Sequence, residues 1–166
     1  MGSTGSRGAA FWTPKIAASF TVLEYPLKNS AILDSGTTIH IFNQKSRFIT
    51  FRAAPEGDFV WAGEKKVPIQ GYGTVDIAVS SPKGNHVLRL FDVAYCANFA
   101  CNLVSLRRLS RKGYWWDTRA AYNCLRQADN SIICSLTDRE DQYVIEYVPK
   151  EVAPHSFFVR RNRFNS

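Results

Sequence analysis

The chain has 166 residues, enough for one domain with a modest core and little room for a second. Hydrophobic residues make up 45% of it and charged residues 21%, which excludes a disordered or collagen-like chain. The formal net charge of +7 comes from two basic runs, at 107–112 and 150–163, and the remainder is neutral. Such a basic tail can contact nucleic acid weakly through phosphates, although short basic termini are commonly only solvated.

The four cysteines favour an intracellular protein with reduced, partly buried thiols. None forms a CxxC pair, so the spacing fits neither a zinc finger nor a small disulfide scaffold. No apolar run approaches the roughly 18 residues of a membrane helix, and Pro14 interrupts the N-terminus before a signal-peptide core could form. We therefore expect a cytoplasmic protein with no membrane contact, no cofactor and no bound metal. The cysteines are Cys96, Cys101, Cys124 and Cys134.

Three segments are expected along the chain. Residues 1–28 begin with a Gly/Ser-rich stretch without periodicity and are interpreted as a flexible leader. Residues 29–149 contain short β-branched and aromatic runs separated by turn signals, which indicates an all-β domain. Residues 150–166 form the basic tail.

Within the domain, residues 30–33 predict a buried strand that enters a turn at 34–36 and resumes over 37–42. Residues 59–61 and 67–70 flank 62–66, which predicts a hairpin tip. In 74–79, Val75, Ile77 and Val79 alternate with less apolar residues, so one face of that strand should be buried. A turn at 81–85 leads into a strand over 87–93.

One helix of roughly ten residues is expected after residue 101. Asn102 would cap it and Gly113 would end it. Its apolar stripe would consist of Leu103, Val104, Leu106 and Leu109. A second meander follows, with strands predicted at 114–116, 122–126, 131–136 and 142–148.

The segment Asp34-Ser35-Gly36-Thr37 matches the needs of aspartic-protease chemistry. Such an enzyme places a carboxylate at the end of a buried strand, on a tight turn held by hydroxyl groups. Gly36 lets the backbone approach closely, while Ser35 and Thr37 can hold the carboxylate plane. Asp-Ser-Gly is also an ordinary turn sequence, so the preceding apolar strand is what favours the catalytic interpretation.

This chemistry needs two carboxylates that share one proton, one to activate water and one to polarise the scissile carbonyl. Asp76, Asp92 and Asp117 lack the flanking turn. A second Asp34 would therefore come from an identical chain, and activity predicts a homodimer.

Four segments resemble the Gag-Pol polyproteins of Copia-type (Pseudoviridae) retrotransposons. AILDSGTTIHI at 31–41 resembles the family's "ILDSGATSHM" signature. Residues 60–77 are similar to its Gly-containing hairpin followed by G-x-G-x-V, and residues 90–109 to its "NLLSVSQL" segment. Residues 113–148 look like the stretch that joins the protease to the pre-integrase region, so the resemblance covers about 120 residues in all.

The resemblance implies a closed retropepsin-like β-barrel with one short helix. It also implies a homodimer that processes Gag-Pol, with Asp34 catalytic, and a location in virus-like particles. Gly63, or alternatively Gly71 and Gly73, would lie in a mobile flap, although these can equally be ordinary hairpin and bulge glycines. The mechanism needs no imidazole, so His40 is interpreted as a packing or interface residue.

Two functions stay open from the sequence. One is a homodimeric aspartic endopeptidase that acts on extended polypeptide, and the other is a catalytically inactive β-barrel interaction or assembly domain left from a retrotransposon. A plain nucleic-acid binder is disfavoured, because the basic residues are not interleaved with aromatic residues.

Overall fold

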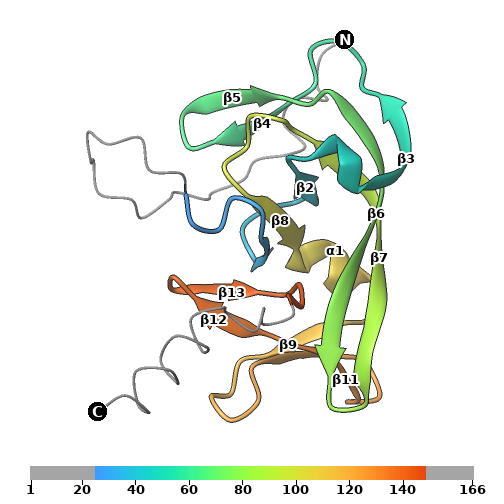
Figure 1. Cartoon of the computed structure of the whole chain (residues 1–166), viewed down its shortest axis with the longest axis vertical. Coiled ribbons are helices and arrows are strands. Elements are labelled where there is room, and N and C mark those ends of the chain that lie inside the picture. Colours follow the sequence, from blue (N-terminus) through green and yellow to red (C-terminus); the bar gives the residue numbers. More distant parts are fainter. Residues whose placement is uncertain (1–24, 149–166) are drawn as a thin grey trace, which may run out of the picture.

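A computed structural model describes residues 25–148 and shows an all-β fold with a single short α-helix in that range (Figure 1). The predicted leader before residue 25 and the basic tail at 150–166 lie outside the described residues. Leu27, in the last part of the predicted leader, is fully buried.

The main sheet has eight strands in the order β12-β13-β1-β8-β2-β7-β6-β3. β1 and β8 pair in parallel, while the long β6–β7 hairpin and the β12–β13 hairpin are antiparallel. A 3-10 turn, η2 (Lys45–Arg47), precedes β3. The strands of this sheet are β1 (Ala31–Asp34), β2 (Ile41–Phe42), β3 (Phe48–Ala53), β6 (Gly71–Ser81), β7 (Gly84–Tyr95), β8 (Asn102–Ser105), β12 (Thr137–Arg139) and β13 (Gln142–Val144).

Two smaller sheets complete the described part of the fold. The hairpin of β4 (Phe59–Ala62) and β5 (Lys65–Pro68) pairs only within itself. β9 (Trp115–Asp117), β10 (Cys124–Arg126) and β11 (Ile132–Ser135) form a three-stranded sheet after α1 (Leu106–Arg111). The β4–β5 hairpin confirms the tip predicted from the sequence.

The expected closure into a barrel is wrong for the described residues. A closed sheet has no edges, whereas this sheet ends at β3 on one side and β12 on the other. β3 lies at the upper right of Figure 1 and β12 in its lower half, and the two strands do not pair. The all-β class is correct, but the main sheet is open.

The parallel β1–β8 pair lies between two hydrophobic clusters. Ala31 and Leu33 point into one cluster, whereas Ile32 between them points into the other. In β8, Val104 points into the same cluster as Leu33, and Leu103 points into the same cluster as Ile32. A strand buried on both faces reads as a continuous apolar run, which explains why the residues before Asp34 do not alternate with polar ones.

The predicted helix begins three residues too early. Asn102, expected as its cap, is the first residue of β8, and the cap of α1 is Ser105. Pairing with β1 buries Leu103 and Val104 on both faces of the sheet, and this tertiary contact overrides the local helical pattern. The predicted end is correct, because Gly113 follows α1 with a φ of +88°.

Candidate functional site

Asp34 is the last residue of β1, where the strand enters a tight turn. The Gly36 amide donates a 2.7 Å hydrogen bond to Asp34 Oδ1, so the turn holds one carboxylate oxygen in place. Ser35 is exposed at the turn, and Thr37 is buried, with its hydroxyl donating to the Ile39 carbonyl. The structure thus brings the four sequence-predicted residues together at one strand end.

β8 fixes this turn from the side. Ser105 lies opposite Asp34 in the parallel register, and its Oγ donates a 2.8 Å hydrogen bond to the Thr37 carbonyl. The Ser105 amide donates a 2.9 Å hydrogen bond to His40 Nδ1. The Ser105 hydroxyl also accepts from the Arg108 amide and caps α1. One serine therefore links the candidate catalytic turn to the helix.

His40 is buried, in agreement with its interpretation as a packing residue. Burial, together with the nearby positive charges of Arg108 and Lys112, lowers its pKa from 6.5 to about 3. The ring is therefore neutral at physiological pH and can accept the Ser105 amide hydrogen bond.

The second oxygen of Asp34 is in a different environment. Oδ2 is buried and has no hydrogen-bond partner among residues 25–148, although the residue as a whole is partly exposed. Burial, and to a smaller extent the nearby Asp34 carboxylate, raises the pKa of the Cys101 thiol. A buried carboxylate oxygen without a partner is costly, so this atom is where a further group would be stabilising.

The three glycines considered for a flap occupy different environments. Gly63 lies at the tip of the β4–β5 hairpin with a φ of +64°, a conformation that favours glycine. Gly71 and Gly73 lie inside β6, where a Cβ on Gly73 would stand 1.9 Å from the Thr50 carbonyl oxygen of β3. Those two glycines permit close strand packing in the sheet rather than forming a hairpin tip.

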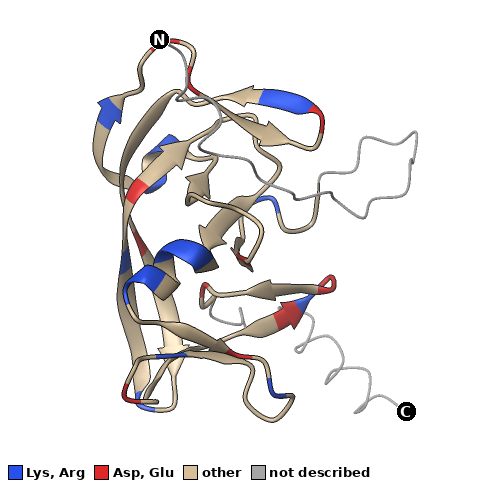
Figure 2. Cartoon of the chain, turned by 180° about the vertical axis from the view of Figure 1, so that it is seen from behind, with Lys and Arg blue, Asp and Glu red and all other residues tan. Residues whose placement is uncertain are grey.

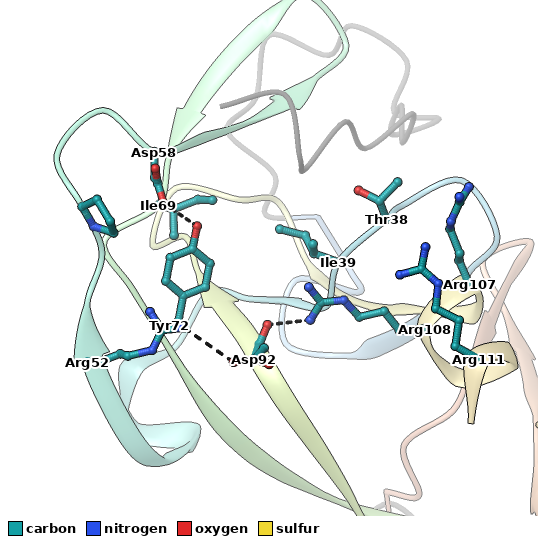
Figure 3. A pocket seen from close by; sticks show the side chains of 11 residues that line it. Thr38, Ile39, Arg52, Asp58, Ile69, Tyr72, Asp92, Arg107, Arg108 and Arg111 are labelled. Atoms are coloured by element: carbon teal, nitrogen blue, oxygen red, sulfur yellow. Dashed lines mark hydrogen bonds and ion pairs between the residues drawn. The ribbon is translucent and has the colours of Figure 1, made fainter. Parts of the chain in front are cut away.

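A pocket of about 620 Å³ lies beside the Asp34 loop (Figure 3). Thr38 and Ile39 of that loop line one side, and Asp58 and Ile69, which flank the β4–β5 hairpin, line another. The remaining lining residues include four arginines, one tyrosine and a second aspartate: Arg52, Arg107, Arg108, Arg111, Tyr72 and Asp92.

The basic run at 107–112 is evident in the sequence, but its partners in this pocket are not. Arg52 and Tyr72 come from strands far away in the sequence, so only the fold brings them to α1. Asp92, with a φ of +50°, lies where the β6–β7 register shifts. An irregular strand residue of this kind has no clear signal in a single sequence.

All four cysteines are buried and free, as expected. In residues 25–148, no group of three or more His, Cys, Asp or Glu side chains is arranged to hold a metal ion. No helix in this range has the length and apolar character needed to cross a bilayer.

The fold and the site define an all-β domain that presents a single Asp-Ser-Gly turn at the end of a buried strand. The chain belongs to the Pol polyprotein, beta-barrel domain family, whose profile matches residues 31–114. It is also 33% identical over 75 residues to the putative transposon Ty5-1 protein of Saccharomyces cerevisiae, an alignment covering 45% of this chain and 46% of that protein. No solved structure matches.

The two comparisons confirm the resemblance and identify the chain as a region of a retrotransposon Pol polyprotein. The alignment spans less than half the length of the yeast relative.

Proposed function

We propose that the chain is the aspartic endopeptidase domain of a retrotransposon Pol polyprotein, and that it acts as a homodimer to process Gag-Pol. Its substrate is extended polypeptide, and its place of action is the cytoplasm, within virus-like particles. Family membership supports the setting, and the Asp34 turn supports the reaction.

The observation that carries the proposal is the unequal environment of the two Asp34 oxygens. The Gly36 amide fixes Oδ1, whereas Oδ2 has no hydrogen-bond partner among the described residues. A second carboxyl group sharing a proton with Oδ2 would satisfy it and would complete a catalytic pair. Oδ2 is buried within one copy, so this pairing requires that the dimer expose Oδ2 to its partner while the Gly36 amide keeps its hydrogen bond to Oδ1.

A second copy of the chain is the source of that carboxyl group. The sequence has no other Asp-Ser-Gly or Asp-Thr-Gly triplet. Asp76 is held by Arg89, and Asp117 by Arg119 and Arg126, so neither is available to face Asp34. A two-fold axis beside the turn would bring two copies of Asp34 together.

The reaction is hydrolysis of a peptide bond. The ionised carboxylate removes a proton from water, and the water oxygen attacks the scissile carbonyl carbon. The protonated carboxyl donates its proton to the carbonyl oxygen, and the C–N bond then breaks as the nitrogen takes up a proton. Thr37 and Ser105 are positioning residues, because they hold the turn and do not touch the reacting atoms.

The β4–β5 hairpin is the element suited to close over the substrate. Within residues 25–148 its strands pair only with each other, and Gly63 gives its tip a backbone without a side chain. A lid of this kind excludes water and brings its backbone against the bound peptide.

A second function, a catalytically inactive interaction or assembly domain, is favoured by a specific observation. Oδ2 of Asp34 is buried within a single copy, where water does not reach it. The open edges at β3 and β12 also offer unpaired backbone groups for association without catalysis.

Self-processing separates the two functions. The chain, fused to the polypeptide that flanks it in its own reading frame, is incubated at mildly acidic pH and analysed by mass spectrometry. We expect cleavage by the unmodified protein and by Asp138→Asn, an exposed control on β12, and none by Asp34→Asn. Equal processing of all three proteins would contradict the proposed endopeptidase activity of Asp34.

Subunit mixing tests the shared site directly. When Asp34→Asn protein is added in excess to unmodified protein, mixed dimers should inactivate nearly every unmodified subunit. A chain that completes its own site would retain its full activity in the same mixture. Sedimentation that shows only monomer at high concentration would contradict the dimer.

A further inference from the structure

The basic pocket lies beside the loop that follows Asp34. Its wall includes Thr38 and Ile39, four and five residues after Asp34 on the same loop. Its other side is the base of the β4–β5 hairpin, at Asp58 and Ile69. The pocket therefore opens between the candidate catalytic loop and the candidate lid, as Figure 3 shows.

Positive charge exceeds negative charge in the pocket. Three of its four arginines come from α1, which is coloured blue along much of its length in Figure 2. The two acidic residues already have partners: Asp58 accepts a 2.6 Å hydrogen bond from the Tyr72 hydroxyl, and Asp92 pairs with Arg52 at 3.5 Å. The four arginines thus outnumber the two aspartates by two charges.

The excess positive charge of the pocket lies mainly on two arginine side chains, Arg107 and Arg111. Arg108 is partly buried, and its Nη1 donates a 2.8 Å hydrogen bond to the Asp92 carbonyl. Arg107 and Arg111 are exposed, and neither makes a side-chain hydrogen bond or ion pair with residues 25–148. Two guanidinium groups are therefore free to bind an anion at the pocket, and guanidinium binds carboxylate with two parallel hydrogen bonds.

We infer that this pocket is a specificity subsite that takes an acidic side chain, Glu or Asp, of the bound polypeptide. The inference rests on the proposed function. Ile39 and Ile69 form an apolar wall for the methylene groups of the side chain, and Arg107 and Arg111 pair with its carboxylate. The substrate class is thus extended polypeptide with an acidic residue at one fixed distance from the scissile bond.

A nucleic acid fits this pocket less well. Binding of single strands relies on exposed aromatic faces on which bases stack. Among residues 25–148, Tyr72 is the one aromatic side chain that lines the pocket, and Arg52 lies over its ring at 4.8 Å. The Asp58 and Asp92 carboxylates would also repel a run of phosphates more strongly than they would repel one carboxylate.

The first arm of the test measures cleavage. A peptide library of diverse sequence is digested by the unmodified protein, and the cleaved sequences are read by mass spectrometry. We expect enrichment of Glu and Asp at one position, and loss of that enrichment in the variant Arg107→Glu/Arg111→Glu. The control Lys83→Glu/Arg139→Glu changes net charge equally outside the pocket and should keep the preference. Cleavage without a preference for Glu or Asp would contradict the acidic subsite but would still support the endopeptidase function.

The second arm measures binding without catalysis, so that it stands even when no cleavage occurs. Asp34→Asn protein is titrated with two fluorescein-labelled extended peptide pools, identical except for Glu or Gln at the fixed position. We expect about tenfold tighter binding of the Glu pool, equivalent to about 1.4 kcal/mol, and loss or reversal of this preference after Arg107→Glu/Arg111→Glu. Equal binding of the two pools would overturn the inference.

A single-stranded oligonucleotide serves as the competing probe in the same titration. Tighter, Arg107- and Arg111-dependent binding of the oligonucleotide would make phosphate the ligand and would overturn the acidic-peptide subsite. If the Glu pool binds more tightly but the unmodified protein cleaves no peptide, the acidic-peptide subsite is supported and the proposed catalysis is contradicted.

Discussion

The Ser105 amide donates a 2.9 Å hydrogen bond to Nδ1 of His40, and this contact joins the start of α1 to the loop that follows Asp34. The two residues are 65 positions apart in the sequence. Because the Ser105 hydroxyl also holds the Thr37 carbonyl, the turn that carries Asp34 is fixed by a neighbouring strand rather than by its own residues alone.

Stability should depend on pH through His40. Its pKa is lowered from 6.5 to about 3 in the fold, mainly by burial, so between these values the unfolded chain binds a proton that the folded chain does not. The stabilising contribution is fully present above about pH 6.5 and is lost as the pH falls toward 3.

Urea unfolding at pH 7.5 and pH 5 measures this effect. His40→Asn keeps an acceptor near the Nδ1 position and removes the titration, so its loss of stability between the two pH values should be smaller than that of the unmodified protein. His86→Asn, an exposed position on β7, should behave like the unmodified protein. An equal pH response in all three proteins would exclude His40 as the cause.

Ser105→Ala should lower the free energy of unfolding by about 1–3 kcal/mol. The substitution leaves the Thr37 carbonyl without its buried donor and removes the cap of α1. Ser110→Ala, on the exposed side of the same helix, should change stability by less than about 0.5 kcal/mol. Chemical denaturation compares the three proteins, and similar values for the two variants would contradict the role given to Ser105.

Gly73→Ala should separate β3 from β6. A Cβ at this position would stand 1.9 Å from the Thr50 carbonyl oxygen, a backbone atom that cannot move without shifting the strand. We expect a loss of about 1–3 kcal/mol, the usual cost of forcing extra volume into a packed site. Hydrogen exchange of β3 amides should also accelerate. Ala78→Ser adds one heavy atom at an exposed position of the same strand. This control should neither lower the free energy of unfolding nor accelerate the exchange of β3 amides.

Local sequence signals predicted those elements whose partners are close in the chain. The β4–β5 hairpin, the alternating face of β6 and the Asp34 turn each follow from a few adjacent residues, and all three are present. Val75, Ile77 and Val79 are fully buried, as their spacing indicates. Periodicity and turn chemistry were sufficient at these positions.

The features that could not be predicted, or were predicted wrongly, depend on pairing between strands that are far apart in the sequence. Residues 102–105 form a strand because β1 lies beside them, and that partner is about 70 residues away. β3 contributes Arg52 to the pocket across a second long-range pairing, with β6. A single sequence does not show which distant strands pair or in which register. Neither the open sheet nor the pocket could therefore be derived from it.

Tyr72→Phe should weaken the wall of the basic pocket. The Tyr72 hydroxyl donates a 2.6 Å hydrogen bond to Oδ2 of Asp58, a buried carboxylate that flanks β4. Burial and this hydrogen bond both raise the pKa of Tyr72, so the hydroxyl stays protonated and donating at physiological pH.

Removing that donor leaves a buried acceptor without one of its partners, and we expect a loss of about 1.5–3 kcal/mol in the free energy of unfolding. Tyr122→Phe removes a hydroxyl from a half-exposed ring and should change stability little. Because Asp58 lies at the base of the β4–β5 hairpin, Tyr72→Phe should also accelerate amide exchange in that hairpin. Unchanged exchange there, together with unchanged stability, would show that the contact does not hold the hairpin against the sheet.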